Sequence, residues 1–328
     1  MTPAVTRVQD MPKIAIQIEP MWGFEFHEIR AIAEACERSG WDALWVSDHI
    51  FLGGDAVDRN CYEAWTLLAA LAPVTNTLRL GTLVTCNSYR HPALLAKMAA
   101  GIDDMTGGRL DFGIGAGWKQ DEYQAYGYDF PGIGTRQAQM SEAIDLSRLL
   151  WTEPYADFEG RHYTLDRAVC APKPVQSPLP VWVGGHGDNL LRIVAEKADG
   201  WNMVFGRTLD ELRDRHAVLD RHCGELGRDP ASIDRSVFLF TALADDDAEL
   251  EALTADQIDR LGPMAERFIG AGRSAGLVGA ADEVAASLRD HLATGFGGLH
   301  LLFPRGHTVE LIERYSAEVL PLLEGWDG

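Results

Sequence analysis

The sequence predicts an α/β fold, a (β/α)8 TIM barrel built as one large domain with insertions after strands four and seven. Three observations predict it. Short apolar runs rich in Val, Ile, Leu and Phe recur along the 328 residues, segments with helical spacing separate most of them, and the runs number eight. Eight parallel strands are the number that closes such a barrel. We expect the domain to span 1–328, with 1–11 as a loose N-terminal extension.

Each expected strand is a short apolar run that ends in glycine or polar residues. The eight strands are expected at 13–18, 43–47, 78–85, 109–115, 180–184, 200–205, 236–241 and 298–303. Between them, residues 26–39 show apolar positions three and four apart and stop at Gly40, while Pro92 opens the next clear helix, where its missing amide hydrogen costs nothing.

Two segments are too long for a single crossover between strands. Residues 119–179 hold an expected helix at 137–151, an expected hairpin around "FEGRHYTL" and a proline-rich stretch, and residues 244–280 are first acidic and then rich in Gly and Ala. Long insertions after the carboxyl end of a barrel strand build the cover of an active site.

The composition excludes several classes of partner. The chain has 29 Lys and Arg against 49 Asp and Glu, a net charge of −20, which argues against nucleic acid and anionic membranes. An anionic cofactor would need a local pocket of cations or amides. Five scattered cysteines indicate reduced thiols, no disulfide framework and no metal site. With no secretory segment or apolar run of about 18 residues, a cytoplasmic protein is expected.

The strand expected at 43–47 ends in an acid followed by an imidazole, Asp48 and His49. Active sites of this fold lie at the carboxyl ends of the strands, where an imidazole held by a carboxylate can exchange protons near neutral pH. The alternative is a helix-capping Asp and a surface His. No metalloprotease spacing and no nucleophile elbow accompany the pair.

Two glycine-rich strand ends are further candidates. "GIGAGW" at 113–118 does not match the dinucleotide fingerprint, and its glycines predict either close approach to a flat ring or tight packing within the barrel. "GGHGDN" at 184–189 follows an apolar strand and precedes a helix, so it predicts a nest of amides for a phosphate, or else a plain turn.

The segments "WVSDHI", the long block at 80–118, "PKPVQSPLPVWVGGHG" and "ADGWN" together resemble the luciferase-like flavin and deazaflavin oxidoreductases, most closely the actinobacterial branch that uses coenzyme F420. The resemblance implies a barrel that binds the cofactor ring at its mouth and the cofactor phosphate near strand five. It assigns catalysis to His49 and Asp48, with Asp48 near the ring's polar edge and His49 near the reacting carbon, where either Asp48 or the ring's own polar edge orients the imidazole. It places the cofactor against Leu83, Val84, Thr85, Cys86, Ala116, Gly117, Gly184, Gly185, His186 and Gly187.

Within the resemblance, a non-proline cis peptide is expected at Leu83-Val84. One position departs from the family: some relatives carry a catalytic Glu where this chain has Trp118, and Glu122 could replace it only if the loop turned it inward. We interpret Trp118 as a wall of the substrate pocket, which favours an apolar or flat substrate. For the cofactor's acidic tail, position alone suggests Arg90, Lys119 and Lys173, with solvated surface charge as the alternative.

The resulting functional hypothesis is hydride transfer between coenzyme F420 and a small organic substrate. The alternative is an FMNH2-dependent monooxygenase, with FMN as the cofactor, and a third hypothesis is a barrel that binds a flavin without turning it over. A homodimer is a further expectation from the resemblance.

Overall fold

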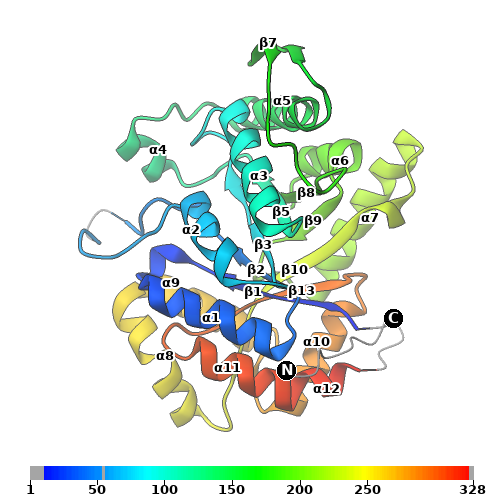
Figure 1. Ribbon diagram of the computed structural model, residues 1–328. Coiled ribbons are helices and arrows are strands. Elements are labelled where there is room, and N and C mark those ends of the chain that lie inside the picture. The colour runs from blue at the N-terminus through cyan, green and yellow to red at the C-terminus, as the bar shows by residue number, and fades with distance from the viewer. Residues whose placement is uncertain (1–10, 54–55, 325–328) are drawn as a thin grey trace.

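The computed structural model describes residues 11–53 and 56–324, and it contains a closed barrel of eight parallel strands (Figure 1). The expected extension at 1–11 lies, apart from Met11, outside the described residues. Around the barrel the strands follow the order β3, β2, β1, β13, β10, β9, β8, β5, and β5 closes the ring onto β3. Their bounds are β1 Lys13–Ile18, β2 Ala43–Val46, β3 Arg79–Thr82, β5 Leu110–Gly115, β8 Val181–Gly184, β9 Gly200–Met203, β10 Asp234–Phe240 and β13 Gly298–Leu302.

Helices surround the strands, and one or more follow each strand in the chain. The helices are α1 Phe26–Ser39, α2 Ala64–Leu71, α3 Pro92–Thr106, α4 Gln120–Tyr126, α5 Ile133–Thr152, α6 Asp188–Lys197, α7 Leu209–Leu226, α8 Asp247–Leu261, α9 Pro263–Ser274, α10 Ala281–Leu292, α11 Thr308–Arg314 and α12 Leu320–Leu323. Within the described residues, no helix combines the length and the apolar character needed to cross a bilayer.

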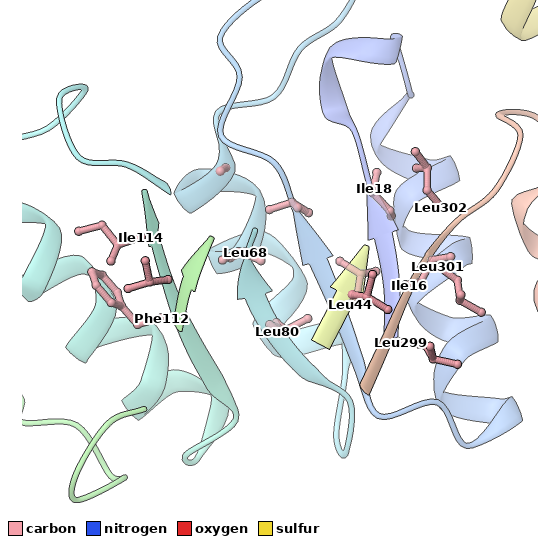
Figure 2. Packing of buried hydrophobic residues seen from close by; sticks show 14 of the residues in the cluster. Ile16, Ile18, Leu44, Leu68, Leu80, Phe112, Ile114, Leu299, Leu301 and Leu302 are labelled. Atoms are coloured by element: carbon pink, nitrogen blue, oxygen red, sulfur yellow. The ribbon is translucent and has the colours of Figure 1, made fainter. Parts of the chain in front are cut away.

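The core lies between the strands and this ring of helices. Outward-pointing side chains of neighbouring strands, such as Ile16, Leu44, Leu80 and Leu299, form one buried layer (Figure 2). Burial on both faces explains why the strands read as continuous apolar runs. The inside of the barrel is filled separately by a small cluster that includes Trp45 and Trp182.

The third strand differs from the continuous run expected at 78–85. It is interrupted at Leu83-Val84, where the peptide bond is cis as expected, and it resumes as β4 Thr85–Cys86. Gly81 pairs with Asp111 and Thr85 with Ile114, so four steps along one strand face three steps along the other. This is a one-residue bulge, which bends the strand at the mouth of the barrel.

Both expected insertions are present. After β5 come α4, α5 and the antiparallel hairpin of β6 Ala156–Glu159 and β7 Thr164–Ala168. In Figure 1, α5 and β7 lie at the top and α4 lies to the left. After β10 come β11 Ala242–Leu243, α8, α9 and β12 Val278–Gly279, with β11 and β12 paired in a small parallel sheet. The short helix α4 was not expected from the sequence, and it carries a residue of the candidate site.

Candidate functional site

His49 lies just beyond the carboxyl end of β2 and contacts a buried carboxylate. Its Nδ1 atom is 3.0 Å from Oε2 of Glu122, a residue of α4 whose side chain is 1% exposed. Glu122 also accepts hydrogen bonds from the Tyr89 hydroxyl at 2.7 Å and the Ile50 amide at 2.8 Å. The loop between β5 and α4 therefore turns Glu122 inward, the condition under which it could replace the acid that some relatives carry at the position of Trp118.

The environment of this pair favours the ionised forms of both groups. Burial alone would lower the pKa of His49, but the hydrogen bond and charge of Glu122, with the charge of Glu19, raise it above the ordinary imidazole value. Burial would raise the pKa of Glu122, and its bonds to His49, Tyr89 and Ile50 outweigh that effect and lower it. A protonated imidazole beside a carboxylate is thus stable at the mouth of the barrel.

A second acid lies near His49. Glu19 directly follows β1, is 5% exposed, and accepts a hydrogen bond from Gln17 Nε2 at 3.0 Å. Burial raises its pKa. Our sequence reasoning missed Glu19, although the rule that polar residues at strand ends face the site, applied to the strand at 13–18, would have found it.

Asp48 does not orient His49, so that expectation was wrong. Its carboxylate is 6% exposed and accepts hydrogen bonds from Arg90 Nη1 and Nη2 at 2.6 and 2.8 Å, from Thr85 Oγ1 at 2.7 Å and from the Cys86 amide at 2.9 Å. Four donors occupy both oxygens. Asp48 therefore ties the end of β2 to β4, and the carboxylate that contacts the His49 ring is that of Glu122.

The side chains of Thr85 and Cys86 point into protein rather than along an open surface. Besides its bond to Asp48, the Thr85 hydroxyl accepts from Trp65 Nε1 at 3.0 Å, and Cys86 Sγ lies 3.1 Å from the Tyr123 hydroxyl. Leu83 and Val84, in contrast, are partly exposed at the bulge. Of the expected contacts on this strand, these two are the side chains open to a ligand.

The glycines of "GIGAGW" serve internal packing, one of the two alternatives that the sequence left open. A Cβ atom on Gly113 would lie 1.8 Å from the Thr82 carbonyl oxygen, and one on Gly115 would lie 2.6 Å from Val84 Cγ2. Gly117 has a φ of +76°, and a Cβ there would meet the Tyr123 hydroxyl. Ala116, between them, is 8% exposed. The bulge between β3 and β4 therefore packs against the glycines of β5, where no side chain stands in the way.

The loop at 184–187 leads from β8 into α6. Gly184 packs against Val84, Gly185 has a φ of +133°, and Gly187 is the N-cap of α6, with open space where a side chain would be. No side chain caps the first amides of α6. Those amides are therefore available to an anion, which fits the predicted phosphate nest.

The only acid in the first turn of α6 is neutralised. Asp188 pairs with Arg221 Nη2 at 2.9 Å and lies 3.5 Å from His222 Nε2, both on α7. On the other side of the loop, His186 Nε2 lies 2.9 Å from Arg207 Nη2. Arg207 was not singled out from the sequence, because no spacing links it to residue 186.

The cations suggested by position are engaged elsewhere. Arg90 pairs with Asp48 and Glu63, and Lys119 is buried beside Asp121, so neither is a solvated surface charge. Lys173 Nζ donates to backbone carbonyl groups at the end of α5. These contacts argue against a role for any of the three in binding an acidic tail.

Trp118 stands at the rim of the site. Its side chain is 69% exposed, and its ring meets His49 edge to face with centroids 5.6 Å apart. An apolar ring left open to solvent beside a titratable group is the kind of surface that an apolar ligand covers.

These residues fit a flat cofactor that carries an anionic group. The α6 amides and the Arg207 guanidinium, whose Nε is buried without a partner among the described residues, supply donors for the anion. The buried Asn87 Oδ1 atom, also without such a partner, is an acceptor at the end of β4. Among the described residues no cluster of His, Cys, Asp or Glu could hold a metal ion.

The structure is thus a closed parallel barrel with an imidazole, a buried carboxylate and a loop of uncapped helix amides at the carboxyl ends of its strands, which is where enzymes of this fold have their active sites. The model of the luciferase-like monooxygenase family matches residues 4–298, and the chain belongs to that family. It is an oxidoreductase.

Two curated relatives are similar over most of the chain. The F420-dependent glucose-6-phosphate dehydrogenase of Kineococcus radiotolerans is 30% identical over 319 residues, covering 89% of this chain and 91% of the relative. The F420-dependent hydroxymycolic acid dehydrogenase of Mycobacterium tuberculosis is 29% identical over 247 residues, covering 74% and 67%.

Solved structures share the fold. An F420-dependent secondary alcohol dehydrogenase in complex with an F420–acetone adduct aligns with a TM-score of 0.80 at 20% identity, over 96% of this chain and 99% of the other. The monooxygenase RslO1 from Streptomyces bottropensis aligns with a TM-score of 0.77 at 23% identity, over 94% and 99%. Dehydrogenases and monooxygenases thus share this barrel, so the fold alone does not choose between the two chemistries.

Proposed function

We propose that this protein is a coenzyme F420-dependent oxidoreductase that transfers a hydride between the deazaflavin and a small organic substrate at the mouth of the barrel. The contact between His49 and Glu122 carries the proposal, because it supplies the proton carrier that hydride transfer to or from a carbonyl requires. Two curated relatives with F420-dependent dehydrogenase names support the choice of cofactor.

Glu122 determines which nitrogen of His49 exchanges the proton. A carboxylate next to Nδ1 keeps a proton on that atom, so Nε2, which makes none of the hydrogen bonds found in the described residues, is the exchanging position. In the direction of alcohol oxidation the neutral imidazole accepts the hydroxyl proton, and in the direction of carbonyl reduction the imidazolium donates it.

The cofactor, when bound, supplies the hydride chemistry. The residues of this chain that would hold it are Leu83 and Val84 at the bulge, and Gly185, His186 and Gly187 with the α6 amides for the phosphate. Since the cofactor carries the difficult chemistry, the barrel's contribution is chiefly to position the reactants and to exclude water from them.

Trp118 supports an apolar or flat substrate. It places an exposed aromatic ring within reach of any molecule that approaches Nε2 of His49. Some relatives carry a Glu at this position, and the contact of Glu122 with His49 supports the proposal that Glu122 supplies the carboxylate here.

A fluorescence titration of the apoprotein with oxidised coenzyme F420, with a parallel titration with FMN at matched salt and pH, tests the proposal. We expect saturable binding of the deazaflavin at micromolar concentration or below and weaker binding of FMN. A preference for FMN, together with oxygen-dependent turnover, would instead establish the monooxygenase chemistry. Binding of neither compound would remove the assignment of the phosphate nest.

A further inference from the structure

A small pocket opens beside the loop at 184–187, where β8 and β9 end and α7 begins. Its volume is about 180 Å³, and its lining consists of His186, Met203, Arg207, Glu211, Asp214 and Arg215. The pocket lies next to the predicted phosphate nest, because His186 belongs to both.

Two guanidinium groups in this pocket are incompletely neutralised. Arg215 is half-buried, and none of the hydrogen bonds or ion pairs found in residues 11–53 and 56–324 engages it. Arg207 contacts Glu211 at 3.4 Å, but its Nε atom is buried without a partner in the same residues. Burying part of a guanidinium group costs free energy unless an anion pairs with it. The chain has a net charge of −20, so acids are abundant, yet none of them forms such a pair with Arg215 in the described residues.

The imidazole adds a donor. Arg207 Nη2 donates to Nε2 of His186, so the proton of the neutral ring is on Nδ1. Burial and the charges of Arg207 and Arg215 lower the pKa of His186, which keeps the ring neutral near pH 7. The Nδ1–H group of neutral His186 is therefore a hydrogen-bond donor for a ligand, and its Nε2 acceptor is already occupied by Arg207.

The two acids of the lining differ in availability. Glu211 accepts the Thr208 amide at 2.9 Å in the capping box of α7, so its carboxylate is committed to the helix. Asp214 also lines the pocket, and none of the hydrogen bonds or ion pairs found in the described part of the chain involves its carboxylate. It is the group whose charge opposes an anion there.

We propose that this pocket is an anion subsite in which Arg215, Arg207 and His186 hold carboxylates of the cofactor's acidic tail, next to the α6 amides that take its phosphate. The proposal rests on the proposed function. His49 follows β2, which is three strands away from β8 around the barrel, so the pocket is built on other strands than the His49 site. A phosphorylated substrate would present the same chemistry, and the experiment separates the two sources.

The test compares two ligands on four proteins. Intact coenzyme F420 and the same deazaflavin without its acidic tail are titrated by fluorescence into the wild type, Arg215→Gln, Asp214→Asn and the control Arg192→Gln, whose exposed side chain pairs with Glu196 on α6. We expect Arg215→Gln to weaken binding of the intact cofactor about tenfold and Asp214→Asn to tighten it about twofold. The control should change neither ligand, and binding of the tail-free ligand should be the same in all four proteins.

Other results overturn the proposal in distinguishable ways. If the wild type binds both ligands and Arg215→Gln weakens both equally or neither, the tail subsite is wrong while the proposed function stands. If Arg215→Gln leaves both affinities intact and raises only the KM for a phosphorylated substrate, the pocket serves the substrate. If the wild type binds neither ligand, the proposed function fails and the subsite with it. Thermal unfolding of each variant checks that the fold is retained.

Discussion

At the scale of single residues, His49 and Glu122 act as a unit. Glu122 belongs to α4, inside the segment at 119–179 that the sequence suggests is an insertion, yet its carboxylate is buried against the imidazole. Replacing His49 tests whether the barrel only binds a cofactor or also transfers protons.

For His49→Ala we expect a loss of turnover of about 10²- to 10⁴-fold with little change in affinity for the deazaflavin, because proton transfer is removed while the nest at α6 remains. Steady-state kinetics and fluorescence titration measure the two effects. Unchanged activity would favour the hypothesis of a barrel that binds without turnover. His27→Ala, at an exposed position on α1, is the matched control.

Replacing Glu122 with Gln should shift the pH dependence. The carboxylate raises the pKa of His49, so the rate of alcohol oxidation, which needs the neutral ring, should rise with pH through a value above that of ordinary imidazole. In Glu122→Gln this rise should move to lower pH, and a profile that did not move would contradict the pairing.

The same pair makes a contribution to stability with a definite sign. Because the pKa of His49 is raised on folding, the contribution is fully present below the imidazole pKa of the unfolded chain and is lost as pH rises through the raised value. Urea unfolding between pH 6 and 9 should show this decline in the wild type and a flatter curve in Glu122→Gln.

At the scale of elements, the bulge between β3 and β4 and the glycines of β5 depend on each other. Gly113→Ala would put a methyl group on the Thr82 carbonyl, and we expect a loss of about 1–3 kcal/mol in the free energy of unfolding. Gly101 lies in the middle of α3, and a Cβ atom added there would meet no atom of another element within 4 Å. Gly101→Ala should therefore raise the free energy of unfolding by about 0.5–1 kcal/mol. Denaturant unfolding of both variants checks the contrast, and equal effects would refute it.

At the scale of the whole molecule, Arg305 joins three parts of the chain. It follows β13, is 7% exposed, and donates to Asp256 of α8 at 2.9 Å, to Glu28 of α1 at 3.0 Å and to the Gly23 carbonyl at 2.9 Å. The insertion after β10 is thereby fastened to the barrel next to its first helix.

For Arg305→Met we expect a loss of about 1–3 kcal/mol in the free energy of unfolding and faster amide exchange across α8, because Glu28 and Asp256 each lose a hydrogen bond from Arg305, although Asp256 keeps its pair with Arg260. Arg273→Met, which breaks a well-exposed pair with Asp247, should change stability by less than about 1 kcal/mol. Exchange in α8 that was equal in the two variants would show that Arg305 does not hold the insertion.

The sequence by itself determined the barrel, the two insertions and the candidate strand ends. Apolar runs, glycine stops and proline starts are local signals, and they located His49 and the loop at 184–187 at strand ends. The cis peptide at Leu83-Val84 was expected from the resemblance. The resemblance added the family, which the match over residues 4–298 confirmed.

Only the tertiary structure decided which side chains meet. Whether Asp48 or Glu122 holds His49 depends on the path of a loop 73 residues further along the chain, and the four donors on Asp48 come from β4 and the loop after it. Likewise, Arg215 of α7 lines the same pocket as His186 because α7 packs beside α6. Partners of this kind are set by packing between distant elements, and local sequence carries no spacing that records it.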